Sequence, residues 1–97
     1  MSVTSEQIRA GRALLRWEQK DLAEASKVSL PSIKRLEIQP GALAAQERTV
    51  AAIRAALELA GVIFVDEDGE GAGVRLRKAG SGAVSIPIED LNAENDE

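Results

Sequence analysis

The chain has 97 residues, of which 12 are Lys or Arg and 16 are Asp or Glu, and it contains no cysteine or histidine. The lack of thiols and imidazoles excludes disulfides, thiolate nucleophiles, histidine bases and the usual zinc or haem ligands. We therefore predict a protein that is not an enzyme and that binds no cofactor or metal. No apolar run has the length of a signal peptide or a membrane span, so we expect a cytoplasmic protein without membrane contact.

Charge divides the sequence into two parts. Residues 1–60 contain nine Lys or Arg and seven Asp or Glu, a net charge of +2, whereas residues 61–97 contain three and nine, a net charge of -6. Because DNA affinity depends on local phosphate contacts, a mildly basic N-terminal part is able to bind DNA within an acidic protein. The small excess of cations predicts modest non-specific binding.

A first helix is predicted from residue 5 to about residue 16. Thr4 is followed three residues later by Gln7, which is the spacing of a capping box at a helix N-terminus. The apolar stripe of this helix consists of Ile8, Gly11, Leu14 and Leu15. Trp17 follows, and we expect it to be a packing residue, because surfaces that stack bases normally carry several aromatic side chains.

Residues 19–37 have the pattern of two short helices joined by a tight turn. Their apolar positions are Leu22, Ala23, Val28, Ile33 and Leu36. Ser29 is suited to cap the second helix, and Pro31 fits its first turn, where a backbone N–H has no intrahelical partner. The outward face of the second helix then consists of Leu30, Pro31, Lys34 and Arg35. Two such helices, the second with outward cations, form the unit that inserts a helix into the major groove of DNA.

This segment resembles the helix-turn-helix of the Cro/Xre-like repressors, a family of regulators with a lambda-repressor-like DNA-binding domain. The matching residues are Gln19, Ala23, Val28, Ser29, Ile33, Leu36 and Glu37. The resemblance implies a mainly α domain of four helices, in which Glu37 pairs with Arg12 as a buried scaffold. The family usually has a left-handed glycine before the Val-Ser pair, whereas this chain has Lys27, so we expect a slightly different turn.

A loop over residues 38–46 and a fourth helix over residues 47–60 are predicted next. Pro40 and Gly41 form a strong turn signal, and Gly61 is suited to end the helix. The buried face of the helix is expected to consist of Val50, Ile53 and Leu57. In the resembling family this loop and the start of the next helix approach the phosphate backbone, which implies phosphate contacts by Gln39, Gln46 and Arg48.

From residue 62 the apolar spacing changes from the period of a helix to that of a strand. Residues 62–65 and 74–77 are predicted to form the two strands of a β-hairpin, with residues 66–73 as its turn. An isolated hairpin is marginal in water, so this one should pack on the helices or pair with a second copy. Because the family's small repressors commonly dimerise, we expect a homodimer through residues 62–78 and an inverted-repeat operator.

The hairpin turn partly matches a calcium-binding loop. Its first, third, fifth and sixth positions are Asp66, Asp68, Glu70 and Gly71. The twelfth position is Arg77, where a bidentate glutamate is required, and the flanking residues have the pattern of strands instead of helices. We therefore interpret these residues as the turn of a hairpin, without a metal.

The patterns divide the chain into three regions, which are a DNA-binding domain over residues 1–61, the hairpin over 62–78 and a C-terminal region over 79–97. In the last region, residues 79–82 have the composition of a linker. Residues 83–88 alternate like a strand, but Pro87 limits them to an edge strand or an extended segment. The final residues are acidic and are expected to be disordered.

The sequence thus predicts a sequence-specific DNA-binding transcriptional regulator, a dimeric repressor that binds double-stranded DNA through the helix near residues 29–38. The residues predicted to contact DNA are Gln19, Lys20, Ser29, Leu30, Pro31, Ser32, Lys34, Arg35, Gln39 and Arg48. Among them Arg35 is suited to read guanine, and Gln19 with Lys20 to hold phosphate. The alternative hypothesis is a protein-interaction module, an antitoxin or antiactivator on the same scaffold, with a protein partner bound through the C-terminal region.

Overall fold

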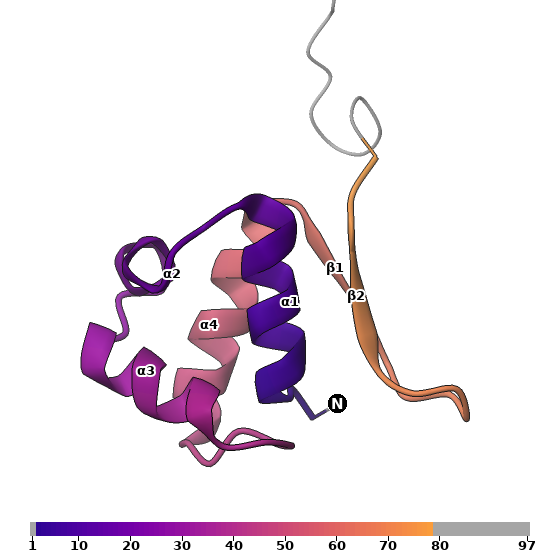
Figure 1. Cartoon of the computed structure of the whole chain (residues 1–97), viewed down its shortest axis with the longest axis horizontal. Helices are drawn as coiled ribbons and strands as arrows, with labels where there is room; N and C mark the ends of the chain where they lie inside the picture. The colour runs from indigo at the N-terminus through magenta and orange to yellow at the C-terminus, as the bar shows by residue number, and fades with distance from the viewer. Residues whose placement is uncertain (1, 79–97) are drawn as a thin grey trace, which may run out of the picture.

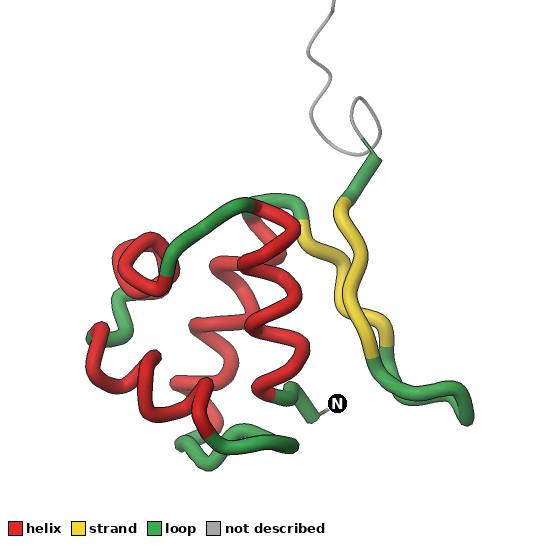
Figure 2. Tube along the Cα trace, viewed as in Figure 1, coloured by secondary structure: helices red, strands yellow, loops and turns green. Residues whose placement is uncertain are grey.

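The computed structural model describes residues 2–78 and contains four helices followed by a two-stranded antiparallel hairpin (Figure 1, Figure 2). The elements are α1 (Ser5–Leu15), α2 (Gln19–Ser26), α3 (Leu30–Ile38), α4 (Glu47–Leu59), β1 (Val62–Val65) and β2 (Gly73–Leu76). This confirms the predicted mainly helical domain with a hairpin after the fourth helix. The predicted linker, edge strand and acidic tail of residues 79–97 lie outside the described residues, as does the protein partner site assigned to them.

Helices α1 and α4 lie in the middle of the molecule, with α2 and α3 on one side and the hairpin on the other (Figure 1). Helix α1 packs on β2 and α4 packs on β1, while α3 contacts α1 and α2 contacts α4. The hairpin and α3 therefore lie on opposite sides of a shared helical centre. Within residues 2–78, no helix is both long enough and apolar enough to cross a membrane.

The predicted capping box at the start of α1 is confirmed. Thr4 Oγ1 accepts from the backbone N–H of Gln7 at 3.1 Å, and Gln7 Oε1 accepts from the N–H of Thr4 at 3.0 Å. The Gln7 amide also donates to the carbonyl of Gly73 at 3.0 Å, which ties the start of α1 to the hairpin. The assignment of Leu14 to the apolar stripe is wrong, since its side chain is 39% exposed. At about 100° per residue, Leu14 lies well to the side of the stripe that Ile8 begins.

The turn between α2 and α3 contains a left-handed lysine. Lys27 has φ 65° and ψ 18°, so the expectation that lysine would change the turn is wrong. Its N–H donates to the carbonyl of Ala23 at 2.9 Å. The hydroxyl of Ser26 donates to the Leu22 carbonyl at 2.7 Å and accepts from the N–H of Val28 at 3.2 Å. These local hydrogen bonds hold a backbone conformation that costs a non-glycine residue roughly 1–2 kcal/mol.

Helix α3 begins as predicted and ends at Ile38, which agrees with the predicted recognition helix near residues 29–38 and lies one residue inside the predicted loop over residues 38–46. Ser29 Oγ accepts from the N–H of Ser32 at 3.3 Å, and Pro31 occupies the first turn. The helix includes Ile38, which had been placed in the following loop. The prolyl-glycyl signal at residues 40–41 lies beyond the helix, so the loop begins after Ile38 and not at it.

The loop after α3 is anchored to the N-terminal segment. Leu43 N–H donates to the Val3 carbonyl at 3.0 Å, and Ser5 N–H donates to the Gly41 carbonyl at 2.9 Å. The carboxylate of Glu6 accepts from Gly41 N–H at 3.1 Å. Backbone hydrogen bonds from Glu6 itself and from Gly41 lower the pKa of the Glu6 carboxyl. The chain that leaves α3 is thus fixed in place beside the start of α1.

One hydrophobic core includes both the helices and the hairpin. Its buried members are Val3, Ile8, Leu22, Ile33, Leu36, Ile53, Ala56, Leu57, Val62 and Phe64. Trp17 is partly buried against this core, which confirms that it is a packing residue. Because Val62 and Phe64 of β1 belong to the core, the hairpin packs on the helices, which was the first of the two arrangements expected for it.

The hairpin pairs Val62 with Leu76 and Phe64 with Val74. Strand β2 begins at Gly73, so the predicted second strand over residues 74–77 is wrong by one residue. The difference arises because Gly73 pairs with the last residue of β1, although glycine has a low strand propensity. Helix α4 ends at Leu59, and Gly61 follows its C-cap with φ 117°, so the chain turns there into β1.

Candidate nucleic-acid interface

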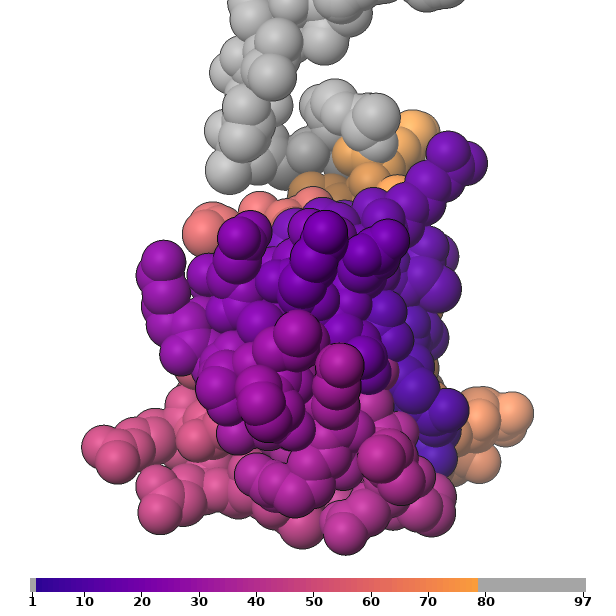
Figure 3. Space-filling model, turned by 60° about the vertical axis from the view of Figure 1, so that its left-hand side comes forward, coloured from indigo at the N-terminus to yellow at the C-terminus, as the bar shows by residue number. Residues whose placement is uncertain are grey.

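Helix α3 has one buried face and one exposed face. Ile33, Leu36 and Glu37 are buried. The exposed positions are Pro31, Lys34, Arg35 and Ile38, which follow the i, i+3, i+4, i+7 spacing of a single helix face. Figure 3 shows the side of the molecule on which α3 lies, in magenta, open to solvent. The helix therefore presents a continuous surface of two cations and two apolar side chains.

Helix α3 and the loops on either side of it contain exposed cations but no exposed carboxylate of their own. From residue 27 to residue 46 the charged residues are Lys27, Lys34, Arg35 and Glu37. The three cations are exposed, whereas the Glu37 side chain is only 4% exposed and is paired with Arg12. A helix face that bears cations and no carboxylate attracts phosphate more effectively than a helix face of mixed charge does. We call residues 27–46 the α3 surface.

Glu37 joins three elements and so fixes the position of α3. Arg12 Nε donates to Glu37 Oε2 at 2.7 Å, and Arg12 Nη2 donates to Glu37 Oε1 at 2.6 Å. Arg12 Nη1 also donates to the carbonyl of Trp17 at 3.0 Å, and Gln19 Nε2 donates to Glu37 Oε1 at 3.0 Å. The pairing of Arg12 with Glu37 implied by the family resemblance is confirmed. A planar bidentate pair of this kind holds α3 at a defined orientation to α1 and α2.

The start of α2, where Gln19 and Lys20 were predicted to hold phosphate, has a mixed charge. Gln19 is half-buried and its amide donates to Glu37, so only its second N–H can face outward. Lys20 is exposed, with Nζ 3.9 Å from Glu18 Oε1. Asp21 Oδ2 accepts from the Glu18 N–H at 2.8 Å, which places a second carboxylate at the helix N-terminus. These carboxylates oppose a phosphate here, so the cations of α3 dominate the attraction.

The other predicted residues are placed as follows. Ser29 and Ser32 lie at the first turn of α3, where the Ser29 hydroxyl donates to the Ser32 hydroxyl at 2.9 Å. Leu30 is half-buried, so less of its side chain is available for contact than the sequence suggested. Gln39 is exposed directly after α3, and Arg48 is exposed on the first turn of α4.

Two residues of the α3 surface were missed by the sequence analysis. Ile38 is 80% exposed and continues the face begun by Pro31, Lys34 and Arg35. Its position could have been found from the seven-residue spacing to Pro31, had the helix been extended by one residue. Lys27 is exposed at the turn, and the signal for it was its charge beside the cap of α3.

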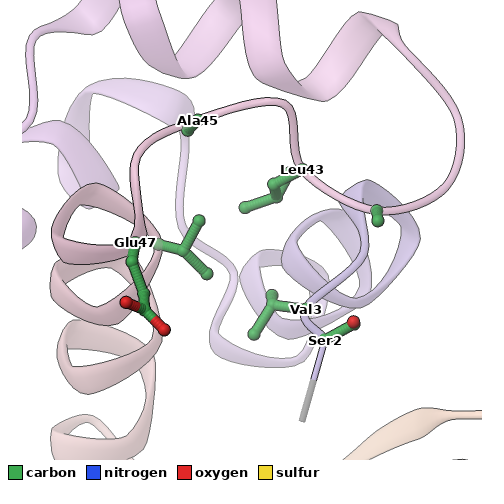
Figure 4. Close-up of a pocket in the computed structure, with 7 residues that line it drawn as sticks. Ser2, Val3, Leu43, Ala45 and Glu47 are labelled. Atoms are coloured by element: carbon green, nitrogen blue, oxygen red, sulfur yellow. The ribbon is translucent and has the colours of Figure 1, made fainter.

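A shallow open pocket of about 290 Å³ lies between the N-terminal segment and the start of α4 (Figure 4). Ser2, Val3, Leu43, Ala45 and Glu47 are among the residues that line it. Its single carboxylate has no catalytic partner among these side chains. In the described part of the chain, no three acidic side chains are grouped so that they could hold a metal ion. The exposed face of α3 is therefore the stronger candidate for a functional site.

Comparison with known proteins gives neither a matching family model nor a matching curated protein.

Proposed function

We propose that α2, the turn at Lys27 and α3 form a helix-turn-helix of the Cro/Xre-like, lambda-repressor-like kind. On this proposal the protein is a sequence-specific DNA-binding transcriptional regulator. The observation that supports it best is the division of α3 into a core face and a cationic face without exposed carboxylates. The bidentate anchor of Glu37 adds support, because a helix that reads base edges must be held at a fixed angle.

Each exposed side chain of α3 has a chemical role in this proposal. Arg35 donates two hydrogen bonds to guanine, while Lys34 and the hydroxyls of the first turn contact phosphate or base edges. Pro31 and Ile38 contact thymine methyl groups, since both are exposed apolar side chains on the same face. These assignments place base reading on one face of a single short helix.

The regulator acts as a repressor in the cytoplasm by occupying its operator. Two exposed cations on α3 give one copy a weak electrostatic attraction to DNA. A homodimer through residues 62–78 on an inverted repeat provides two such helices at a fixed spacing. Dimerisation is therefore part of the proposed function and not an addition to it.

The proposal is tested by selecting bound sites from random double-stranded DNA with the full 97-residue chain at low salt. The selected site is then titrated with Arg35→Ala, which should weaken binding by about 1–3 kcal/mol and relax one base position in each half-site. Arg54→Ala is the matched control. It removes the same charge as Arg35→Ala, but Arg54 lies over the Phe64 ring beside the hairpin and not on α3. Equal losses for the two variants, or no enrichment in the selection, would refute the assignment.

A further inference from the structure

Strand β2 has a free edge. Arg77 N–H donates to the Gly61 carbonyl at 2.7 Å, so residues 73, 75 and 77 direct their backbone groups to β1. Because these directions alternate in an antiparallel pair, the N–H and carbonyl groups of Val74 and Leu76 point to the opposite edge. Within residues 2–78 these groups have no hydrogen-bond partner. The β2 edge is also accessible, since Arg75, Leu76 and Arg77 are exposed whereas Val62 and Phe64 of β1 are buried.

Charge is separated along the hairpin. The turn between the strands contains Asp66, Glu67, Asp68 and Glu70, all exposed. Arg75 lies in β2 and Arg77 directly follows the strand, and among residues 2–78 neither of their side chains forms an ion pair. At about 3.3 Å per residue, Arg77 lies roughly 13 Å beyond Gly73. This exceeds the Debye length of about 8 Å at physiological salt, so the acidic turn compensates the charge of Arg77 poorly within one copy.

We propose that the β2 edge binds the β2 edge of a second copy of this chain, in antiparallel orientation, to form a four-stranded sheet. A two-fold axis makes the two edge strands antiparallel, which brings the cations of each copy beside the acidic turn of the other. A parallel arrangement would place like charges together and is disfavoured. Charge complementarity therefore selects both the partner and its direction.

Repulsion between like charges also selects the register of the two β2 strands. Pairing centred on Arg75 places this residue directly opposite Arg75 of the second copy, which is unfavourable because like charges then face each other. Pairing centred on Val74 instead sets Arg75 beside Gly73 of the second copy, where the lack of a side chain leaves room for the guanidinium group. Val74 residues of the two copies then meet at the two-fold axis.

This inference rests on the proposed function, whose dimer it describes in detail. Helices α1 and α4 lie between the hairpin and α3 (Figure 1), so pairing at β2 leaves the α3 surface of each copy uncovered. A dimer of this form has two DNA-binding surfaces and satisfies the backbone groups of an otherwise open strand edge.

The test is a sedimentation measurement of the full chain without DNA. The natural chain should be a dimer. One double variant carries Arg75→Glu and Arg77→Glu, and the other carries Asp68→Lys and Glu70→Lys. The dimer dissociation constant of each should be at least tenfold higher than that of the natural chain. An equimolar mixture of the two variants should form a heterodimer, because both charged contacts are then complementary again. The control variant Glu24→Lys changes an exposed residue of α2, far along the chain from the hairpin, and should remain a dimer. Recovery in the mixture also shows that both variants are folded.

Three results would overturn the inference. These are a natural chain that stays monomeric at high concentration, a dimer that resists both charge variants, and a monomer that dimerises only when residues 79–97 are deleted. The last result would assign the β2 edge to the chain's own C-terminal region. Because no DNA is present, these outcomes are independent of the α3 assignment. A dimer that binds no DNA would refute the DNA-binding role of α3 and leave the edge pairing intact. A monomer that binds a single half-site would refute the edge pairing, and with it the dimeric part of the proposed function, and would leave the DNA-binding role of α3 intact.

Discussion

The α3 surface and the hairpin turn lie on opposite sides of α1 and α4 and carry opposite charge (Figure 1). Residues 27–46 present three exposed cations and bury their one carboxylate, whereas residues 66–72 present four exposed carboxylates. The net charge of -4 describes neither surface. Local charge therefore determines which partner each surface attracts, because attraction to phosphate falls off within a Debye length.

The two surfaces also differ in how they are fixed. The α3 surface depends on polar contacts, chiefly the pairing of Glu37 with Arg12. The hairpin depends on apolar burial of Val62 and Phe64 and on the Gln7 amide. Substitutions in the common core should therefore affect both surfaces, while substitutions in the polar network should affect α3 first.

The largest expected effect is that of Leu57→Ala in the shared core. Leu57 is 0% exposed, so the substitution should lower the free energy of unfolding by about 3 kcal/mol through lost burial and a residual cavity. Urea unfolding followed by circular dichroism measures this loss. Leu59→Ala is the control on the same helix, since Leu59 is 92% exposed and its loss should stay within about 0.5 kcal/mol. Similar losses for the two variants would contradict the assignment of the core.

The next effect is that of Glu37→Gln, which removes the charge that compensates Arg12. We expect a loss of about 2–3 kcal/mol, below the full effect of breaking a buried pair because the Arg12 side chain is 18% exposed. Hydrogen exchange should show faster opening of α3 than of the hairpin. Glu58→Gln breaks a surface pair with Arg54 and should cost less than about 1 kcal/mol. Uniform exchange across the chain would show that Glu37 does not act on α3 in particular.

The sequence predicted the elements well where the determining signals are local. The capping box at Thr4, the cap at Ser29 and the periodic apolar residues each depend on neighbours within a few positions. The strand boundary at Gly73 was wrong by one residue because pairing with Val65 extends β2 beyond its local propensity. The loop boundary at Ile38 was wrong by one residue because the Pro40-Gly41 signal lies beyond the end of the helix. Lys27 was misjudged because hydrogen bonds around the turn support a conformation that lysine alone disfavours.

The candidate site was predictable in outline only. The cations of α3 followed from helical spacing, but the role of Gln19 as a donor to Glu37 depends on a contact between residues 18 positions apart. The link from Gln7 to Gly73 spans 66 positions and has no sequence signal. The burial of Glu37, which leaves α3 with exposed cations and no exposed carboxylate, likewise follows from the packed fold.

The smallest expected effect is that of Lys27→Gly. Lys27 is left-handed, so glycine should remove backbone strain and raise the free energy of unfolding by about 0.5–1 kcal/mol after the added chain entropy is counted. Thermal and urea unfolding measure the gain. Glu24→Gly, in the interior of α2, should instead lose about 1 kcal/mol. A loss at both positions would mean that the lysine side chain stabilises the turn by a contact that outweighs its strain.

The most direct test of the contrast between the two surfaces is an NMR titration of the labelled full chain with a short DNA duplex at low salt. We predict amide shift changes concentrated in residues 27–39, with the amide shifts of residues 66–72 unchanged beyond the effect of added salt. Changes centred on the hairpin turn, or no changes at any DNA concentration, would contradict the claim that the α3 surface binds DNA.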